Sequence, residues 1–394
     1  MRVCHVVYSF FPFDPRVRKE VEALTRAGHQ VDVIAVMDYG EVALESVNGV
    51  VVHRIQMPIV RGGKWRYAYQ YMRFLLSSSI LLLRIHFRQR FQLVHVHSLP
   101  DFQVFCTLPI KLSGVPVVLD LHELFPEIMA ARFRLRSSHW LIRVARVIER
   151  LSCLYSSKVI AVTEQRARIL RERGVDRSKL VVVMNSPDVT THSRLPLEAI
   201  RAELNVRGHL VLIQAGGINP ERDLETLLRA AQILAQKRLV SLLLFGKGDS
   251  RYRQHLKEFA SREAFNVDFR LSEWVPPKKA FAYVSASAIG LGTYERNPLT
   301  EIAAPHKVFE YVAARRPLVL ANLSGLRTMW ESAALFYEPG DEQDLAAKID
   351  MIVGNDSLAS ELVEAASAIL QRTDSRASRE VLLNVYEELA AESG

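Results

Sequence analysis

One carboxylate and one lysine stand at the start of a short predicted helix within PHKVFEYVAARRPLV, the segment from Pro305 to Val319. Pro305 suits the first turn of a helix, where its missing N–H would have no partner. The residues after the helix read as a parallel strand, so the helix N-terminus is expected at the carboxyl edge of a sheet, where unpaired N–H groups bind phosphates. Lys307 would strengthen such a phosphate site. The carboxylate of Glu310 would repel a phosphate, so its natural partners are neutral hydroxyls such as those of a ribose. Alternatively, Lys307 and Glu310 form an ordinary solvated helix start.

Length and charge define the setting of this segment. With 394 residues, of which 49% are hydrophobic, the chain is long enough for two domains with their own cores. The formal net charge is +8, but the basic residues are spread along the chain without a nucleic-acid-binding signature. The excess therefore favours an anionic small ligand or an anionic membrane surface over nucleic acid.

The cysteines and the N-terminal residues indicate the compartment. Cys4, Cys106 and Cys153 lie in apolar patterns without C-x-x-C pairs, as expected for buried cytosolic thiols and not for disulfides or metal ligands. No signal peptide is expected before the first strand, which begins at Arg2, and no apolar run reaches transmembrane length. These features predict a cytoplasmic protein, and they also allow a location at the inner face of the plasma membrane.

Short β-rich runs alternate with helical patterns along most of the chain, as βαβ units require. The expected strands are Arg2–Ser9, Gln30–Val36, Val50–Ile55, Leu93–His97, Val115–Leu121, Lys158–Val162, Leu180–Met184, His209–Ala215, Val240–Phe245, Val267–Leu271, Ala288–Thr293, Pro317–Ala321 and Leu335–Tyr337. Expected helices include Val17–Ala27, Pro100–Leu112 and Glu164–Arg173. No G-x-G-x-x-G follows the first strand, which argues against a nicotinamide-dependent dehydrogenase.

This alternation predicts an α/β protein with two doubly wound, Rossmann-like domains. The first is expected over residues 1–185 and the second over 206–370. A stretch rich in Ser, Pro, Thr and Asp predicts the linker at 186–205. The helical end of the chain, 371–394, is expected to pack back on the first domain.

Four blocks in this order resemble the family 4 glycosyltransferases, the retaining sugar-nucleotide enzymes with the GT-B fold. They are Phe11–Ile34 with its D-P-R-V turn, Val94–Glu127 with its paired histidines, Gln214–Ala230, and the segment from Pro305. The resemblance implies two domains facing across a cleft, with a nucleoside diphosphate sugar, UDP-sugar favoured, bound by the second domain. It further implies transfer of a hexosyl or related group to a glycan, lipid-linked or small-molecule acceptor, in bacterial polysaccharide or glycoconjugate synthesis, without a cofactor or metal ion.

The helix-start and glycine patterns, together with the resemblance, predict which residues bind the donor. They are Gly216, Gly217, Arg222, Gly246, Gly248, Ala303, Ala304, Lys307 and Glu310. Gly217 stands where the family usually has Arg, which leaves Arg222 and Lys307 with more of the pyrophosphate charge, and both are expected to assist catalysis. Alternatively, Arg222 pairs with Glu221 or Glu225 on a solvated turn.

A second departure from the family concerns a glutamate that contacts the sugar in many members. At its place stands Ile302, with Glu301 one residue earlier. Either Glu301 reaches the sugar from a looser loop, or backbone N–H groups of Ala303 and Ala304 bind it. The second option needs no unusual geometry and is the one we favour.

His122 ends an apolar strand in the sequence DLHE, and the resemblance implies contact with the transferred sugar or its transition state. The alternative is a structural hydrogen-bonding histidine. The expected acceptor-side residues are Asp14, Arg16, His97, Asp101 and Glu123, with His97 placed behind His122.

In the segment from Lys64 to Phe91, aromatic residues and leucines are interleaved with arginines. This composition suits an interfacial helix on an anionic membrane, close to a lipid-linked acceptor. The alternative is a core helix with snorkelling arginines. For the whole chain, the alternatives to a transferase are a sugar-nucleotide epimerase of the same fold and a non-catalytic sugar-nucleotide-binding subunit.

Overall fold

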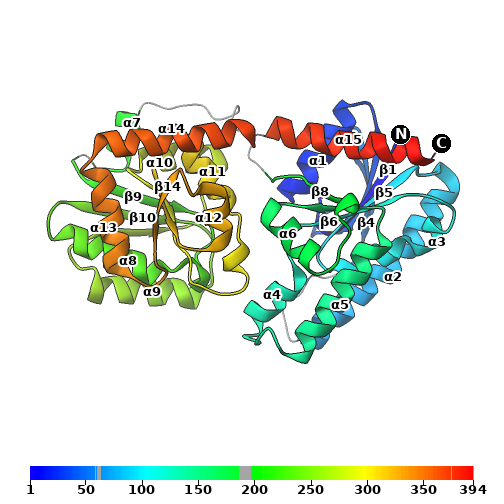
Figure 1. Ribbon diagram of the computed structural model, residues 1–394, viewed down its shortest axis with the longest axis horizontal. Helices are drawn as coiled ribbons and strands as arrows, with labels where there is room; N and C mark the ends of the chain where they lie inside the picture. Colours follow the sequence, from blue (N-terminus) through cyan, green and yellow to red (C-terminus); the bar gives the residue numbers. More distant parts are fainter. Residues whose placement is uncertain (58, 60–63, 186–196, 207, 374, 394) are drawn as a thin grey trace. The chain divides into compact units, whose positions relative to one another are not determined.

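Parallel β-sheets organise both halves of the chain (Figure 1). The structure is a computed structural model that describes residues 1–57, 59, 64–185, 197–206, 208–373 and 375–393. Unit 1 comprises Met1–Asn185 and Arg376–Gly394, and unit 2 comprises Ser186–Ser375. The first part of the expected linker, 186–196, lies outside the described residues, whereas Leu197–Glu203 is not a linker but helix α7 of unit 2.

The sheet of unit 1 has eight strands in the order β3-β4-β2-β1-β5-β6-β7-β8. All neighbouring pairs are parallel except β3 and β4, and the central strands are apolar runs, as sheets covered on both faces require. The strands are β1 (Arg2–Phe10), β2 (Gln30–Val36), β3 (Leu44–Val47), β4 (Val50–Ile55), β5 (Leu93–His97), β6 (Val117–Leu121), β7 (Lys158–Ala161) and β8 (Leu180–Val182).

Helices connect these strands, and the last one comes from the end of the chain. They are α1 (Pro15–Arg26), α2 (Lys64–Gln89), η1 (Asp101–Thr107), α3 (Leu108–Lys111), α4 (Phe125–Arg132), α5 (Trp140–Tyr155), α6 (Glu164–Glu172), η2 (Arg177–Lys179) and α15 (Ser375–Ser393). The single α-helix expected over Pro100–Leu112 is therefore a 3₁₀ segment, η1, followed by one turn of α-helix. Helix α15 buries Leu382, Val385 and Tyr386 in the core of unit 1.

Unit 2 contains two three-stranded parallel sheets, β11-β10-β9 and β12-β13-β14. A bridge between Leu212 and Ile289 joins them, and the Ala288 N–H donates to the Val211 carbonyl at 2.8 Å. The strands are β9 (Leu210–Ala215), β10 (Val240–Phe245), β11 (Asp268–Ser272), β12 (Gly290–Gly292), β13 (Leu318–Ala321) and β14 (Ala334–Tyr337).

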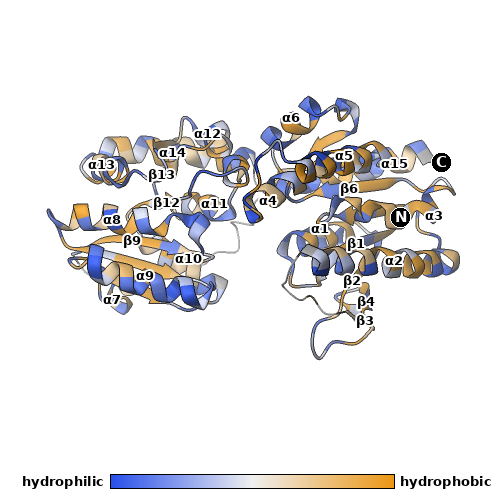
Figure 2. Cartoon of the chain, turned by 90° about the horizontal axis from the view of Figure 1, so that it is seen from below, coloured by the Kyte–Doolittle hydropathy of each residue, from blue (hydrophilic) through white to orange (hydrophobic). Residues whose placement is uncertain are grey.

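The helices of unit 2 surround these strands, and their colours mix blue and orange in Figure 2, whereas the strands between them are largely orange. This is the pattern of amphipathic helices on a buried parallel sheet. The helices are α7, η4 (Pro220–Arg222), α8 (Leu224–Ala235), α9 (Ser250–Glu263), α10 (Pro277–Ala286), η5 (Thr300–Ile302), α11 (His306–Ala313), α12 (Ser324–Trp330), α13 (Glu342–Val353) and α14 (Asp356–Arg372).

Candidate functional site

Two glycine loops meet at the carboxyl edge of the unit 2 sheet, one after β9 and one after β10. The Gly216 N–H donates to the Phe245 carbonyl and the Ile218 N–H donates to the Lys247 carbonyl, both at 2.8 Å. Gly246 has a φ of +156°, and a Cβ there would lie 1.6 Å from the Gly216 carbonyl oxygen. Only glycine permits the two loops to approach each other this closely. Because glycine has no side chain, the backbone of both loops stays open to a ligand.

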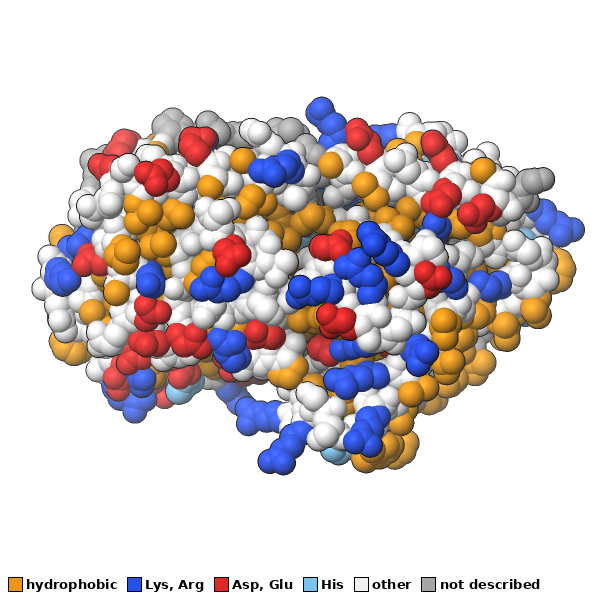
Figure 3. Space-filling view, in the orientation of Figure 1, with side chains coloured by type: hydrophobic (Ala, Val, Ile, Leu, Met, Phe, Trp, Pro, Cys, Tyr) orange, Lys and Arg blue, Asp and Glu red, His pale blue; other side chains and the backbone are white. Residues whose placement is uncertain are grey.

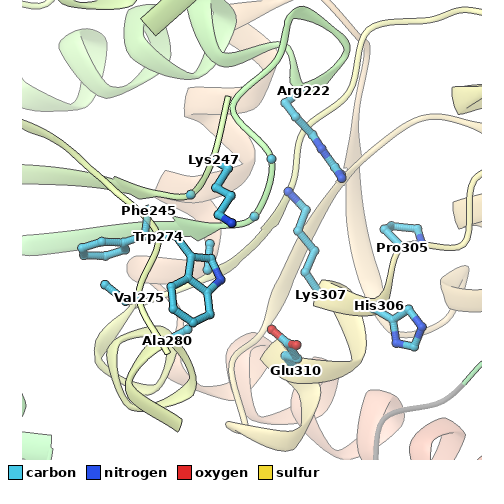
Figure 4. A pocket seen from close by; sticks show the side chains of 14 residues that line it. Arg222, Phe245, Lys247, Trp274, Val275, Ala280, Pro305, His306, Lys307 and Glu310 are labelled. Carbon is cyan, nitrogen blue, oxygen red and sulfur yellow. The ribbon is translucent and has the colours of Figure 1, made fainter. Parts of the chain in front are cut away.

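A pocket of about 530 Å³ lies beside these loops (Figure 4). Its volume falls within the range of about 300–1,000 Å³ that small-molecule sites occupy. The lining residues come from the two loops, from the turn before α8, from the segments around α10 and from the start of α11. They are Ala215, Gly216, Gly217, Arg222, Phe245, Gly246, Lys247, Trp274, Val275, Ala280, Pro305, His306, Lys307 and Glu310.

Lys307 and Arg222 bring two cations to this pocket. Figure 4 shows their side chains pointing toward each other, and both lie over the ring of Tyr294, with Arg222 Cζ at 4.6 Å and Lys307 Nζ at 5.2 Å from its centroid. Arg222 also donates to the Tyr294 hydroxyl. Among the described residues, Arg222 forms no ion pair with Glu221 or Glu225, and the Glu225 carboxylate accepts from His255 at 2.9 Å. The alternative in which Arg222 pairs with one of these glutamates is therefore not supported.

The ammonium group of Lys307 is buried, and among the described residues it has no hydrogen-bond partner. Burial, and then the nearby Arg222 guanidinium, lower the pKa of Lys307 well below its ordinary value, although Glu310 acts in the opposite direction. A buried cation without a hydrogen-bond partner is costly, so this site favours an anion that would supply the missing acceptors.

Glu310 lies one turn after Lys307 on α11 and lines the same pocket, half-buried. In Figure 4 its carboxylate lies on the opposite side of Lys307 from Arg222. The helix thus presents a cation and an anion to different parts of the pocket. This arrangement excludes the plain solvated helix start considered from the sequence.

Lys247 and Trp274 line the pocket but were not among the donor-binding residues predicted from the sequence. The Lys247 ammonium lies 5.8 Å from the centre of the Trp274 ring, and Val275 and Ala280 extend the apolar surface beside it. Lys247 follows β10 by two residues and Trp274 follows β11 by two. A search for cationic and aromatic residues directly after the strands would have found both, because parallel strands end at one edge of the sheet.

Three expected donor residues do not line the pocket, and the structure assigns them other roles or none. A Cβ at Gly248 would lie 2.1 Å from the Ile218 carbonyl oxygen, so this glycine permits the contact between the loops. The Ala303 N–H already donates to the Thr300 carbonyl at 3.0 Å, and Ala304, like Ala303, lies outside the lining residues. Our preference for these two N–H groups as sugar ligands is therefore wrong for Ala303 and unsupported for Ala304.

Glu301, the other option for that segment, also has partners away from the pocket. Its carboxylate accepts from Arg296 at 3.1 Å and from the Ser324 N–H at 3.3 Å. Neither proposal for the family's sugar-contacting glutamate is therefore supported by the pocket geometry.

In unit 1, His122 directly follows β6 and is fixed by hydrogen bonds. Its Nε2 lies 3.2 Å from a carboxylate oxygen of Asp120 and 3.0 Å from Nδ1 of His97, and its N–H donates to the Ser98 hydroxyl at 3.1 Å. Its side chain is 20% exposed, whereas those of Asp120 and His97 are fully buried. His122 is thus the accessible end of a buried cluster.

Arg16 compensates the charge of Asp120 through two hydrogen bonds of 2.7 Å to the two carboxylate oxygens. Burial alone would raise the pKa of Asp120, but Arg16, and then His122, hold it well below its ordinary value. Asp120 is therefore a carboxylate that accepts from Arg16 and orients the imidazole of His122.

The cluster continues into the core of the unit as a chain of hydrogen bonds. Nε2 of His97 lies 2.9 Å from Nδ1 of His5, whose Nε2 lies 3.3 Å from the Tyr386 hydroxyl on α15. Tyr386 reaches His95 at 2.6 Å. Burial lowers the pKa values of His5, His95 and His97, so these imidazoles are neutral and act as donors and acceptors. The network ties the position of His122 to the C-terminal helix.

Two sets of these side chains have the donor types and spacing of metal ligands, with their donor atoms within 4.8 Å of one another. They are His5, Glu20, His95 and His97, and His97, Asp120 and His122. Arg16 lies between the carboxylates, 3.1 Å from Glu20 and 2.7 Å from Asp120. Since a guanidinium already supplies the positive charge there, we interpret the cluster as a hydrogen-bonded core.

The expected acceptor-side residues are largely engaged inside unit 1. Arg16 and Asp101 are buried and so cannot contact an acceptor directly, which corrects the sequence-based assignment. His97 is also buried, and it lies behind His122 as expected. Asp14 caps α1 by accepting from the N–H groups of Arg16 and Val17, and Glu123 accepts from Arg166 at 2.5 Å. Sequence patterns cannot distinguish a buried charged network from an exposed one, because both need the same residue types.

Comparisons with known proteins relate both units to sugar-transferring enzymes. Residues 14–186 match a family model described as a glycosyl transferase 4-like domain, and residues 209–355 match one described as glycosyl transferases group 1. A curated relative is TuaH of Bacillus subtilis, described as a teichuronic acid biosynthesis glycosyltransferase. It is 25% identical over 267 residues, which are 66% of this chain and 63% of the relative's length.

Solved structures with the same fold align over nearly all of the chain. Sucrose-phosphate synthase from Thermosynechococcus elongatus has a TM-score of 0.77 at 18% identity, with full coverage of both chains. Anabaena HepE in complex with UDP-glucose has a TM-score of 0.71 at 15% identity, covering 98% of this chain and 100% of that one. The E. coli trehalose-6-phosphate protein bound with UDP-2-fluoro glucose has a TM-score of 0.76 at 14% identity, covering 99% of each.

Proposed function

Because the chain belongs to the glycosyltransferases of the family 4 type and has the GT-B fold, we propose that it transfers a hexosyl or related group from a UDP-sugar. We assign the donor to unit 2, the acceptor to unit 1, and retained anomeric configuration to the product. The acceptor is a glycan, lipid-linked or small-molecule hydroxyl in bacterial polysaccharide or glycoconjugate synthesis, in keeping with the pathway for which TuaH is named.

The observation that carries this proposal is the pair Lys307 and Arg222 in the unit 2 pocket. A buried ammonium without a hydrogen-bond partner among the described residues faces a guanidinium, and no neutral ligand would satisfy both. A pyrophosphate supplies acceptor oxygens and negative charge together. The helix N-terminus of α11 favours the same anion, and the open backbone of Gly216 and Gly217 admits it closely.

The rest of the pocket fits the rest of a nucleotide. We assign the base to the apolar side formed by Trp274, Val275 and Ala280, and the ribose hydroxyls to the carboxylate of Glu310. Lys247 lines the pocket beside Trp274 and offers the cation that is missing at Gly217. The departure from the family pattern at Gly217 is in this way compensated within the same site.

In the reaction, the bond between the anomeric carbon and the β-phosphate oxygen breaks, and its electron pair stays on the departing UDP. The acceptor oxygen bonds to the anomeric carbon, and its proton passes to the departing phosphate oxygen. Arg222 and Lys307 stabilise the charge that develops on the leaving pyrophosphate, which takes the place of a metal ion in this proposal. We assign His122, oriented by Asp120 and His97, to the transfer step and not to nucleotide binding.

A transferase is favoured over a sugar-nucleotide epimerase, because both family models and the curated relative are glycosyltransferases. A non-catalytic binding subunit would need the donor pocket but not an oriented, accessible histidine. The ordered position of His122 favours the enzyme.

A thermal-shift screen of nucleotides and nucleotide sugars tests the proposal. UDP and UDP-sugars should raise the melting temperature, since a ligand that binds only the folded protein stabilises it by mass action. Uridine, which lacks phosphates, should shift it much less. The proposal is wrong if no nucleoside diphosphate or nucleotide sugar raises the melting temperature above the shift produced by its nucleoside.

The variant Glu310→Gln tests the ribose assignment. A hydrogen bond to a charged group is worth on the order of 1.5–3 kcal/mol, so UDP affinity should fall more than about tenfold. Calorimetry on the folded variant gives this affinity directly. An unchanged value would remove Glu310 from the donor site.

A further inference from the structure

Helix α2 of unit 1 carries apolar side chains on its exposed face as well as on its buried face. The buried face packs Phe74, Leu82 and Ile85 into the unit. The exposed apolar residues recur every three or four positions over most of the helix and are between 49% and 89% exposed. They are Trp65, Tyr69, Met72, Leu76, Ile80 and Phe87. A helix of a soluble protein normally places polar residues on that side.

Helix α5 repeats this pattern. Its exposed apolar residues are spaced by four, three, four and three positions and are between 47% and 65% exposed. They are Trp140, Val144, Val147, Leu151 and Leu154. Both α2 and α5 pack against η1, and the adjoining α3 exposes Leu108 and, directly after its last residue, Leu112. We call these exposed residues of α2, α3 and α5 the apolar face.

Figure 3 shows apolar side chains gathered along the part of unit 1 where Figure 1 places α2, α3 and α5, with Lys and Arg side chains beside them. Scattered single apolar residues are common on protein surfaces, but a gathered set marks an interaction site. None of the described helices is long and apolar enough to cross a membrane.

The charges around the apolar face are strongly one-sided. Arg66, Arg73, Arg84 and Arg88 on α2 are exposed, and so is Arg143 on α5. The sequence contains no Asp or Glu between Glu45 and Asp101. The one acidic residue of α5, Glu149, is buried and accepts from Arg173 at 2.8 Å.

This combination distinguishes between possible occupants. A second copy of the chain would bring arginines against arginines, which opposes association. An anionic bilayer accepts apolar side chains at its interface and attracts the surrounding arginines. The charge pattern thus selects a lipid surface over self-association.

The apolar face also adjoins the segment that begins at His122. Helix α4 starts at Phe125, and Arg132 at its end donates to the Tyr67 hydroxyl on α2 at 2.5 Å, with its guanidinium 4.6 Å from the centre of that ring. The side of unit 1 that carries His122 is therefore linked directly to the start of α2.

We propose that the apolar face of α2, α3 and α5 binds the surface of an anionic lipid bilayer. Helix α2 is then a core helix on its buried face and an interfacial membrane helix on its exposed face, so both interpretations of its sequence hold. That this surface brings the enzyme to a lipid-linked acceptor rests on the proposed function. Binding to the bilayer does not, since it requires neither donor nor acceptor.

Flotation of the full chain with vesicles tests this proposal. Vesicles of phosphatidylcholine containing phosphatidylglycerol should carry the protein into the lipid layer at low salt, and binding should weaken at high salt. Each basic residue near an anionic surface contributes about fivefold to the binding constant, so reversing three charges should weaken binding at least about a hundredfold. The variant is Arg84→Glu, Arg88→Glu and Arg143→Glu, whose side chains form no ion pair among the described residues.

A matched control changes the net charge equally on the exposed surface of α9 in unit 2, through Arg251→Glu, Lys257→Glu and Arg262→Glu. This control should float almost as the unchanged protein does. An apolar variant, Trp65→Ser, Leu76→Ser and Leu151→Ser, should also lose binding. Its control, Leu239→Ser, Phe265→Ser and Met351→Ser, removes exposed apolar residues of unit 2 and should not.

The proposal is overturned if the protein stays out of the lipid layer at low salt, or if both controls lose binding as fully as the variants. A dimer in light scattering that the apolar variant converts to monomer, without flotation of the original protein, would assign the face to self-association. UDP binding, measured on the same samples, should be unchanged in all four variants. A failure of the lipid proposal is thus distinguishable from a failure of the donor assignment.

Discussion

Replacing Lys307 by Met should stabilise the ligand-free protein and weaken nucleotide binding at the same time. Lys307 is 8% exposed, and its ammonium has no hydrogen-bond partner among the described residues. Burial, followed by the Arg222 guanidinium, lowers its pKa well below the ordinary value, which means that the folded pocket disfavours the charged form. Methionine has a similar length and no charge to bury.

The size of both effects follows from this environment. Leaving a buried polar group unsatisfied costs about 1–3 kcal/mol, and removing it should return a gain of that order in the free energy of unfolding. For a unit of this size, each kcal/mol shifts the melting temperature by about 2–4 °C. In the complex, loss of a hydrogen bond to a charged group should weaken UDP binding by about 10- to 150-fold.

Thermal unfolding and calorimetry on the two proteins measure these effects. Lys257→Met is the matched control, because Lys257 is exposed on α9, outside the pocket, and should change neither quantity. The reasoning is refuted if Lys307→Met lowers the melting temperature of the ligand-free protein and leaves UDP affinity unchanged. That outcome would make Lys307 a structural residue.

Three further predictions concern the donor pocket of unit 2 and the histidine cluster of unit 1. A bound phosphate should raise the lowered pKa of Lys307, so UDP binding should take up a proton and weaken as pH rises between the pKa of the free protein and that of the complex. Calorimetry in buffers of different ionisation enthalpy, at pH values below the ordinary lysine pKa of about 10.4, should show proton uptake that Lys307→Met abolishes. Arg222→Ala should lower turnover at least about a hundredfold. The activity of the unchanged enzyme should persist in excess chelator. Activity that chelation destroys and a divalent ion restores would contradict the metal-free assignment. His122→Ala should depress kcat and kcat/KM together with UDP affinity nearly unchanged, whereas activity lost only in proportion to unfolded protein would assign His122 a structural role.

The strands could be predicted closely from the sequence, because buried parallel strands are apolar runs bounded by turn residues. Gln30–Val36, Leu93–His97 and Val240–Phe245 match the observed strands residue for residue. Strand Leu44–Val47 was missed because it is a short antiparallel edge strand whose side chains are mostly exposed. Its sequence therefore lacks the apolar run that marked the others.

The donor pocket was only partly predictable. Arg222, Lys307 and Glu310 lie in continuous motifs, and the position of each motif after a strand placed them at one sheet edge. Lys247 and Trp274 are single residues on other loops, and their contribution depends on which strands are neighbours. Strand order follows from long-range packing, which local patterns do not specify.

The acceptor side was less predictable, because burial decides the role of a charged residue there. Arg16 and Asp120 form a buried ion pair with two hydrogen bonds, and His97 lies behind His122. Tyr386 joins this network from α15, far along the chain. No spacing rule connects a tyrosine near the C-terminus to histidines of the first strands.

The most direct test of the central claim compares UDP with uridine by calorimetry, in the unchanged protein and in the double variant Arg222→Ala, Lys307→Met. If the two cations hold the pyrophosphate, UDP should bind the unchanged protein at least about tenfold more tightly than uridine, and most of this difference should disappear in the double variant. Equal affinities for UDP and uridine, or a difference that survives in the folded double variant, would contradict the account.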